Sequence, residues 1–478
     1  MLELFTNQSP ALPEILVVLG ALLLLVQGAF MGNRGAGVIS AVAGGVLVLA
    51  ALAAAMVPLG QLFNGSFVMD PMAAFAKVAI FLFSAVAIFL GDAWLGRVND
   101  RKFEFPILVM LAALGMAMMV SAGDLIALYI GVELQSLALY VLAAFRRDDA
   151  KASEAGLKYF VLGALSSGIL LYGVSLIYGF TGSLRFEDIA LAVADGAGTG
   201  AVFGLVFLIC GLAFKVSAAP FHMWTPDVYE GAPTPMVAFF AAAPKLAAMV
   251  LFARTLSDGF FGAMEQWRQV LMVIAVISFV VGGVGGLVQR NLKRLLAYSS
   301  IANIGYALLG IAAGTQMGMQ AMLIFMVLYM IDVTAFFACI MALSRKGREM
   351  ATIDDLSGLK QDKPGMAIAL TLLSLSVLGM PPFSGFWAKY YVFKAAIDAG
   401  LWPIAVAGLV ASVIAAFYYL RIIKVMWFDA APGAADPSPR GAHWVAIAGA
   451  AFSFPVVLFV LAWLEPAAAN AASAFGLG

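Results

Sequence analysis

Apolar runs of about 20 residues, separated by short polar breaks, follow one another along almost the whole chain. Each run is long enough to cross the ~30 Å hydrocarbon core of a bilayer as an α-helix that rises ~1.5 Å per residue. Of the 478 residues, 63% are apolar and only 11% are charged, whereas a soluble domain carries roughly 25% charged residues. Because this composition cannot cover a water-soluble surface, the sequence predicts an all-α membrane protein.

The runs predict about 14 transmembrane helices, with residues 1–478 forming a single polytopic membrane domain. The longest polar interruptions, 345–363 and 429–442, are typical of surface loops. The helices are expected near residues 12–31, 36–58, 72–95, 103–121, 124–145, 154–180, 199–219, 232–254, 267–289, 292–312, 316–344, 366–398, 402–428 and 442–464.

The first run has the length of a secretory signal peptide but not its charge. Its leading segment carries Glu3 and Glu14 and neither Lys nor Arg, whereas a signal peptide has a positively charged leading region. We therefore expect this run to be the first membrane helix, with Pro10 and Pro13 marking its start.

Basic residues alternate between rich and poor loops. The even-numbered loops hold only Arg185, Arg254 and Arg268. Because loops rich in Lys and Arg stay in the cytoplasm, the odd-numbered loops are predicted to be cytoplasmic and both termini to lie outside. The odd-numbered loops hold Arg34, Arg97, Arg101, Lys102, Arg146, Arg147, Lys151, Arg290, Lys293, Arg294, Arg345, Lys346, Arg348, Lys360, Lys363, Arg421, Lys424 and Arg440.

The remaining basic residues are all lysines within predicted helices. Lys77 and Lys394 lie near helix ends, from which they are expected to snorkel to the interface. The others lie deeper, and Glu133 and Asp332 are the acids expected to be buried with them. A charge at the bilayer centre costs at least ~2.5–3.5 kcal/mol, so these side chains need a partner or a hydrated cavity. The deep lysines are Lys158, Lys215, Lys245 and Lys389.

The choice of lysine rather than arginine at every deep position favours proton transfer, because a buried lysine can lose its proton whereas arginine cannot. Glu133 lies about eight residues, ~12 Å, into the fifth predicted helix, and Lys215 lies deep in the seventh. An acid on one helix and a base on another predict a mutual pair. A purely structural salt bridge between the two helices is the alternative, although an apolar contact would serve that purpose at lower cost.

Prolines predict that the seventh and twelfth helices are broken. Pro220 follows the seventh helix, and Pro381 and Pro382 lie within the twelfth. Broken backbone at membrane depth is tolerated where it is buried or lines a water-filled cavity, and matching breaks in two halves indicate a transporter with an internal repeat. Two ordinary proline kinks are the alternative. Lys245 follows Pro244 in the eighth helix, and Lys389 follows the break in the twelfth.

Two further residues are candidates for proton transfer. His222 lies beside the predicted break of the seventh helix and can exchange protons near neutral pH, although a structural histidine fits the same position. Lys158 lies little more than a turn into its helix, so snorkelling competes with a functional role.

The residues give no sign of a redox cofactor. Cys210 and Cys339 lie inside apolar segments and are expected to fill the core rather than to bind metal. The glycine-rich stretch 282–286 lies in an apolar run, which favours close helix packing over a nucleotide-binding loop. The net charge of zero implies no nucleic-acid partner. We therefore expect no cofactor in this chain.

Four motifs resemble the antiporter-like subunits of proton-pumping NADH:quinone oxidoreductase, respiratory complex I. They are ELQSLALY at 133–140, PFHMWTPD at 220–227, APTP at 232–235 and RLLAYSSI at 294–301. The likeness extends through nearly the whole chain. The chain length and the wording of the motifs are most similar to the subunit N branch of that family.

The resemblance implies two inverted five-helix repeats, helices 4–8 (about 103–254) and helices 9–13 (about 267–428), preceded by helices 1–3 (about 12–95) and followed by helix 14 (about 442–464). It implies a charge pair of Glu133 and Lys215, a central Lys245 and an exit-side Lys389. Asp332 receives no role from it.

The resemblance also implies the setting of the chain: a proton-translocating subunit in a bacterial inner membrane, with both termini periplasmic. NADH, flavin, iron–sulfur clusters and quinone are expected in partner subunits, and the partners would include neighbouring antiporter-like subunits and lipid. A subunit of a stand-alone cation/proton antiporter is the main alternative, because it shares the motifs. A transporter of a small neutral solute is a third possibility.

Overall fold

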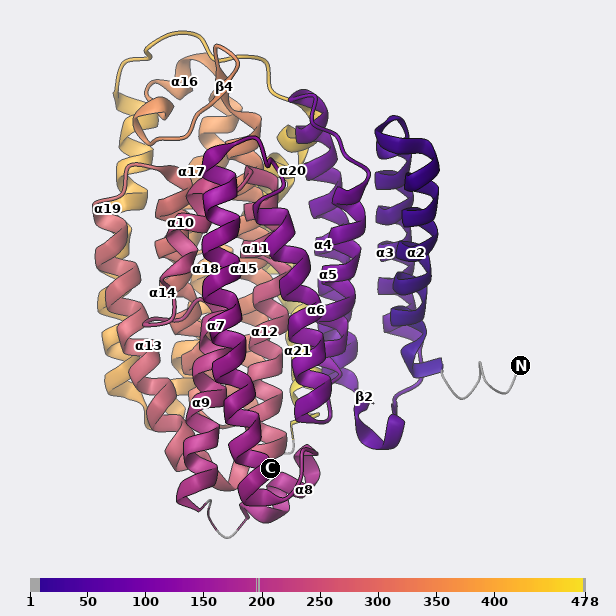
Figure 1. Ribbon diagram of the computed structural model, residues 1–478. Helices are drawn as coiled ribbons and strands as arrows, with labels where there is room; N and C mark the ends of the chain where they lie inside the picture. Colours follow the sequence, from indigo (N-terminus) through magenta and orange to yellow (C-terminus); the bar gives the residue numbers. More distant parts are fainter. Residues whose placement is uncertain (1–8, 195, 197, 476–478) are drawn as a thin grey trace.

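Long helices that run side by side along one common direction make up nearly all of the molecule (Figure 1). The computed structural model describes residues 9–194, 196 and 198–475, so Glu3 lies outside the described residues. The helices of the bundle are α2 (Leu12–Met31), α3 (Ala36–Met56), α4 (Pro71–Arg97), α5 (Glu104–Val120), α6 (Leu125–Ala143), α7 (Ala150–Thr181), α9 (Thr199–Val216), α11 (Thr234–Ala241), α12 (Ala243–Arg254), α13 (Met264–Leu287), α14 (Leu292–Ala312), α15 (Gln316–Ala342), α17 (Pro364–Leu378), α18 (Ser384–Asp398), α19 (Trp402–Phe428), α20 (Arg440–Ala451) and α21 (Val457–Ala472).

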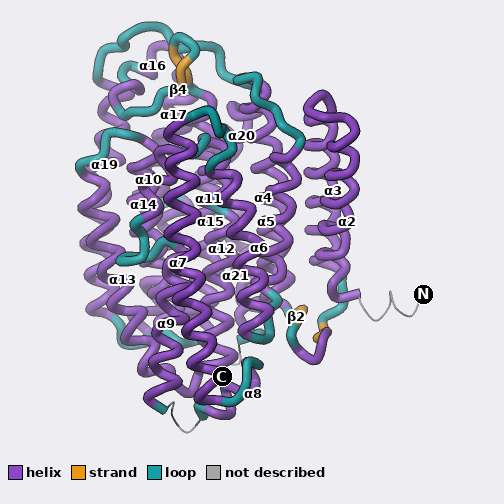
Figure 2. The backbone as a smooth tube through the Cα atoms, viewed as in Figure 1, coloured by secondary structure: helices purple, strands orange, loops and turns teal. Residues whose placement is uncertain are grey.

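Short elements lie at the two ends of the bundle. The helices α10 (Trp224–Gly231), α8 (Phe186–Ala192) and α16 (Leu359–Asp362) are brief, and the described residues form only two small antiparallel hairpins (Figure 2). One hairpin pairs β1 (Gly60–Leu62) with β2 (Phe67–Met69), and the other pairs β3 (Ser344–Arg345) with β4 (Arg348–Glu349). In Figure 1, α16 and β4 lie at the upper end of the bundle, whereas α8 and β2 lie at the lower end.

The expected helical segments agree closely with the observed ones, and the all-helical membrane fold is confirmed. Among the described residues, 11 helical stretches are long and apolar enough to cross a membrane, and one of them, Ser9–Met56, contains both α2 and α3. The apolar helices α5 and α17 are shorter. The exact number of crossings stays a prediction.

Side-chain caps fix where several of these helices begin. Asp70 precedes α4 and accepts a hydrogen bond from the Ala73 amide at 2.7 Å. Asp124 precedes α6 and accepts from the amides of Ile126 and Ala127 at 2.8 and 2.7 Å. An acidic cap satisfies first-turn N–H groups that have no partner within the helix. The cap at Asp124 therefore fixes the start of the helix that carries Glu133.

The glycine-rich stretch 282–286 packs helix against helix, as the sequence predicts. A Cβ atom on Gly282 of α13 would lie 2.5 Å from the Ala302 amide nitrogen and 2.6 Å from the Tyr298 carbonyl oxygen of α14. Only glycine permits so close an approach of two helix backbones, as in other membrane helix pairs.

The two predicted helix breaks are present. Helix α9 ends at Val216 and is capped by Ser217 with φ of 66°, and α17 ends at Leu378 and is capped by Gly379 with φ of 94°. A left-handed residue at this position commonly ends an α-helix. The chain then passes a proline in each case before α10 or α18 begins.

Two further breaks escaped the sequence analysis. Helices α11 and α12 meet at Ala242, whose φ and ψ are −110° and −100°, just ahead of Pro244. Helices α20 and α21 are joined by a π-helical segment, Phe452–Val456, that contains Pro455. Proline removes a backbone donor and disrupts the helix before it, so both positions carried a signal that a continuous apolar run concealed.

The expectation that Lys77 snorkels to the interface is wrong. Its side chain is fully buried and forms an ion pair with Glu14 of α2 at 2.6 Å. Its ammonium group also lies 4.5 Å from the centre of the Phe67 ring and 3.3 Å from Met69 Sδ. The β1–β2 hairpin thus covers the side chain. Glu14 is consequently a buried acid that the sequence analysis did not count.

Candidate functional site

Glu133 of α6 and Lys215 of α9 face each other, as the sequence predicts. Lys215 Nζ lies 3.7 Å from Glu133 Oε1, 2.9 Å from Ser136 Oγ and 3.3 Å from Ser167 Oγ. The Ser167 hydroxyl also donates to Glu133 Oε1, so it bridges acid and base. Lys215 is nearly buried, whereas 24% of the Glu133 side chain is exposed on this chain. Glu133 is therefore less buried than expected.

Lys245 lies immediately after the break at Ala242 and has only neutral partners among its described contacts. Its ammonium group donates to Ser300 Oγ of α14, and the Tyr329 hydroxyl of α15 donates to the same oxygen at 2.8 Å. The ring of Tyr229 lies 5.6 Å away, at cation–π distance. Lys245 is 1% exposed, so it sits in the protein interior between three helices.

Lys389 of α18 reaches back across the break and bonds to the end of α17. It donates to the Val377 and Leu378 carbonyl oxygens at 3.1 and 2.8 Å and to Ser412 Oγ of α19 at 2.8 Å. These carbonyls are free because the last turn of α17 has no following helical residues to bond. The three partners match the three N–H donors of an ammonium group, and the described residues provide no acid among them.

A cavity of about 430 Å³ adjoins Lys389. It extends along α18 to Lys394 and Asp398, which form an exposed ion pair at 3.2 Å. Lys394 thus lies at an exposed helix end, as predicted. The cavity gives Lys389 a route toward the lower end of the bundle.

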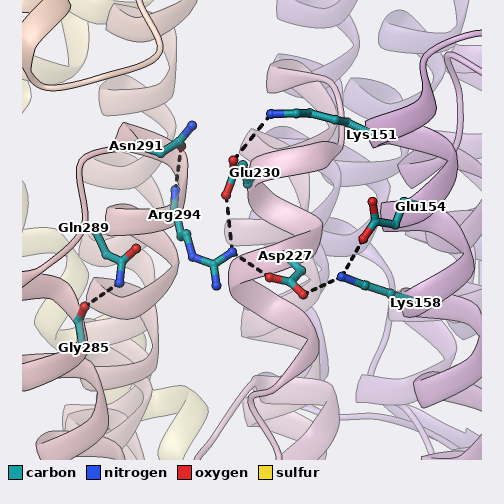
Figure 3. A network of polar contacts seen from close by, with 9 residues as sticks. All are labelled: Lys151, Glu154, Lys158, Asp227, Glu230, Gly285, Gln289, Asn291 and Arg294. Carbon is teal, nitrogen blue, oxygen red and sulfur yellow. Dashed lines mark hydrogen bonds and ion pairs between the residues drawn. The ribbon is translucent and has the colours of Figure 1, made fainter.

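Lys158 belongs to a surface network rather than to the buried lysines (Figure 3). It contacts Asp227 Oδ2 at 2.8 Å, and Arg294 binds the other oxygen of the same carboxylate at 2.6 Å. Asp227 lies on α10, directly beyond the break that follows Lys215. The network consists of Lys151, Glu154, Lys158, Asp227, Glu230 and Arg294, which also line a small pocket.

His222 lies in the turn between α9 and α10, as predicted, but it is not joined to the lysines. Its Nδ1 atom is buried and has no hydrogen-bond partner within the described part of the chain. The structure therefore places it beside the break without a defined proton donor or acceptor.

The hydroxyl partners of the lysines are the residues that sequence reasoning missed. Ser136 follows Glu133 by three residues on the same helix, a spacing that places both on one face. No comparable signal exists for the others, because their contacts join helices far apart in the sequence. The set comprises Ser136, Ser167, Ser300 and Ser412.

A family model described as NADH:quinone oxidoreductase/Mrp antiporter, TM, matches residues 122–415, more than half of the chain. A protein of Caulobacter sp. (strain K31) named NADH-quinone oxidoreductase subunit N is 67% identical over 80% of this chain and 81% of its own length. The chain belongs to the NADH-quinone oxidoreductase subunit N family. Another member, from Rhodospirillum rubrum, is 50% identical over 95% of this chain and 94% of its own.

Solved structures agree with membership of the subunit N family. A chain of respiratory complex I from Thermus thermophilus, solved with bound aureothin, superposes with a TM-score of 0.81 at 32% identity, covering 96% of this chain and 99% of that one. A chain of the Mrp complex from Dietzia sp. shares the fold, with a TM-score of 0.84 at 24% identity over 98% and 97% of the two chains. This chain is therefore a multi-pass membrane subunit of a bacterial NADH-quinone oxidoreductase complex.

Proposed function

We propose that this subunit translocates protons across the membrane through buried lysines, a glutamate and the hydroxyl groups between them, while electron transfer takes place in other subunits. One observation carries the proposal: Lys215, Lys245 and Lys389 each lie next to a helix break, and each is bonded to serine hydroxyls. A hydroxyl can both donate and accept a hydrogen bond, so it can pass a proton on.

Each lysine has a distinct place in the proposed path. Lys215 forms an ion pair with Glu133, so a proton that binds to either residue changes the net charge of the pair. Lys245 is the central lysine of the proposed path. It donates to Ser300 Oγ, which also accepts a hydrogen bond from the Tyr329 hydroxyl, so its described hydrogen-bond partners are neutral. Lys389 borders the cavity toward the lower end of the bundle and would release protons there. Lysine suits these positions because it deprotonates when desolvated, unlike arginine.

Two residues complete the proposed path at its margins. Lys158 is half exposed and held by Asp227, so we place it where protons are taken up rather than in the interior. His222 is proposed as an auxiliary relay beside the first break. Its Nδ1 has no hydrogen-bond partner within the described residues, and no described contact joins it to Lys215, so the path does not depend on it.

The setting is part of the proposal. NADH, flavin, iron–sulfur clusters and quinone would act in partner subunits, and neighbouring antiporter-like subunits would flank this chain. The stand-alone cation/proton antiporter, the main alternative, is covered by the same family model, but the curated relatives at 50–67% identity are named as subunit N and favour the role in complex I. Co-purification with redox-active subunits distinguishes the two roles.

The proposed orientation places both termini in the periplasm. The basic loop that carries α16 and β4 would then face the cytoplasm, because loops rich in Lys and Arg are retained there. Fusions of a reporter to the C terminus should be active only when the reporter works in the periplasm. Activity on the cytoplasmic side alone would refute this orientation.

The proposal as a whole is tested by NADH-driven proton uptake into inverted membrane vesicles that carry Lys245→Ala. We expect assembled complex with strongly reduced uptake. Lys424→Ala is the matched control, because Lys424 is an exposed lysine paired with Asp429, and it should pump normally. Full uptake by assembled Lys245→Ala would overturn the proposal.

A further inference from the structure

Asp332 is a buried acid that the proposed path does not use. It lies on α15 and is 2% exposed. Three hydroxyl groups surround its carboxyl group: Ser376 Oγ at 2.7 Å, Ser384 Oγ at 2.9 Å and Ser453 Oγ at 2.6 Å. These serines come from the end of α17, the start of α18 and the π-helical segment between α20 and α21. Two helix breaks therefore converge on one carboxyl group.

The cluster has more short contacts than hydroxyl hydrogens. The serines make four contacts with the carboxyl oxygens, because Ser384 Oγ lies 2.9 Å from both of them. Ser384 Oγ also lies 2.7 Å from Ser376 Oγ and 2.9 Å from Ser453 Oγ. All six contacts are at hydrogen-bond distance, but three serines supply only three hydrogens. With an ionised Asp332, three contacts have no hydrogen of their own. A proton on Asp332 supplies a fourth hydrogen, so the protonated carboxyl group fits the geometry better.

The charges around the cluster support a proton rather than an ion pair. No described basic side chain pairs with Asp332. Charged side chains on the surrounding helices are bonded elsewhere: Lys389 bonds α17 carbonyls, Lys394 pairs with Asp398, and Glu465 accepts from Tyr391. Lys245 of α12 bonds Ser300, and Arg440 is the first residue of α20. An ionised acid without a counter-charge at this depth costs at least ~2.5–3.5 kcal/mol, and a bound proton removes that cost.

Asp332 and Lys389 share the break between α17 and α18. Ser376, which bonds Asp332, directly precedes Val377, whose carbonyl oxygen accepts from Lys389. Ser384 lies five residues before Lys389 on α18, which corresponds to ~7.5 Å along the helix. The two groups thus lie on either side of one short backbone segment.

We propose that Asp332 is a proton-binding residue of this subunit, one that exchanges its proton when Lys389 changes charge. A neutral Lys389 with a protonated Asp332 carries no net charge, and an ammonium with a carboxylate carries none either. In the exchange, the proton that Asp332 loses is matched by the one that the neutral Lys389 amine gains. Ser384 takes up the Asp332 proton as it gives its own hydrogen to a water molecule, and that water passes a proton to Lys389, so each hydroxyl and the water end with the hydrogens they began with. This inference rests on the proposed proton path.

A purely structural role for Asp332 predicts different behaviour. If the carboxyl group only joins the four segments, Asp332→Asn should serve almost as well, because an amide also accepts and donates hydrogen bonds in the same space. Ser453→Ala should then be at least as harmful, since it removes one of the ties. If Asp332 binds a proton, Asp332→Asn is the more harmful change for pumping, because Ser453→Ala leaves the titratable Asp332 carboxyl group in place.

The test is infrared difference spectroscopy on the intact complex, reduced with NADH, together with proton uptake. We expect a C=O stretching band of a protonated carboxylic acid in the reduced-minus-oxidised spectrum, absent in Asp332→Asn and shifted in Asp332→Glu. The matched control is Asp92→Asn, because Asp92 is bound by Arg101 at 2.9 Å near the surface and should leave the band unchanged. Uptake should fall severalfold in assembled Asp332→Asn.

The outcomes separate this inference from the proposed function. A band that survives in Asp332→Asn, or full uptake by that variant while Lys245→Ala is inactive, would overturn the role of Asp332 alone. Full uptake by both variants would overturn the proposed function. If Asp332→Asn does not assemble, Asp332→Glu still decides the matter, because an unshifted band excludes residue 332 as its source.

Discussion

The two broken helices, α9–α10 and α17–α18, differ in the partners of their buried acid and base. At the first break, Lys215 lies 3.7 Å from Glu133, and Ser167 links the two. At the second break, Lys389 and Asp332 lie on either side of the break and bond only to neutral groups. The first break therefore holds an acid and a base as a pair, whereas the second keeps them apart.

This difference has a direct electrostatic consequence. An ion pair compensates its own charges, so the first break can hold an ammonium and a carboxylate at modest cost. A lone buried charge costs at least ~2.5–3.5 kcal/mol, so the second break gains stability whenever protons leave Lys389 and occupy Asp332. We infer that the first break keeps its two charges stable by pairing them, whereas the second break avoids lone charges by moving a proton between Lys389 and Asp332.

The largest effect is expected at the paired break. Glu133→Ala and Lys215→Ala should each lower proton uptake strongly, because removing one partner leaves the other charge buried and unpaired, a cost of roughly 3–5 kcal/mol for fully buried pairs. Because 24% of the Glu133 side chain is exposed, the carboxylate that Lys215→Ala leaves unpaired can be solvated, so Lys215→Ala should destabilise the subunit less than this range indicates.

The double variant tests whether the two residues act as one unit. Glu133→Ala with Lys215→Ala should be little worse than either single change, as expected for groups in contact. The coupling between Glu133 and Lys215 is obtained by measuring proton uptake by the three variants in vesicles, with assembly checked in parallel. Losses that simply add would mean that the pair does not exist as a functional unit.

The unpaired break should require a titratable lysine, not merely a positive charge. Lys389→Arg keeps the charge but cannot release a proton, so uptake should fall clearly, although less than at the paired break, while the complex assembles. Lys424→Arg is the matched control, because Lys424 is exposed and paired with Asp429, away from the cavity beside Lys389; it should pump normally. Full uptake by an assembled Lys389→Arg variant would leave Lys389 as a structural charge.

The helix positions and the buried lysines could be predicted from the sequence because both have local signals. Apolar runs give helix positions, and a lysine inside such a run stands out by its cost. Pro220 and Pro382 likewise indicate the two main breaks. The serine partners of the lysines have no such signal. Ser300 and Ser412 resemble any small polar residue in a membrane helix, and only the folded structure shows that they bond Lys245 and Lys389.

The error at Lys77 has a related cause. A lysine near a helix end is free to reach the interface unless another part of the chain covers that end. Here the β1–β2 hairpin and Glu14 cover it. The hairpin is too short to be recognised between two apolar runs, so the burial of Lys77 followed from a tertiary contact that no local pattern encodes.

The hydroxyl partners offer a smaller and sharper test of the same comparison. Ser412→Ala removes one of three partners of the unpaired Lys389, so it should lower uptake moderately. Ser136→Ala should matter less, because Lys215 keeps Glu133 and Ser167. A lost hydrogen bond to a charged group costs roughly 1.5–3 kcal/mol. Equal uptake by the two variants would remove the distinction between the breaks.

The smallest effect is expected at His222, which occupies in the first break the position that Ser384 occupies in the second, since Pro220-Phe221 precedes one and Pro382-Phe383 the other. Ser384 bonds Asp332, whereas His222 Nδ1 has no partner within the described residues.

His222→Gln keeps a polar side chain but removes the group that titrates near neutral pH. Because no described contact connects His222 to Lys215, we expect a small loss of uptake that is independent of pH between roughly 6 and 8, the range in which histidine changes charge. Ser384→Ala, measured beside it, should lower uptake more. A large loss in His222→Gln that deepens as the pH falls through this range would show that proton translocation depends on the histidine. The first break would then also depend on a group outside the Glu133–Lys215 pair, and the contrast between the two breaks would no longer hold.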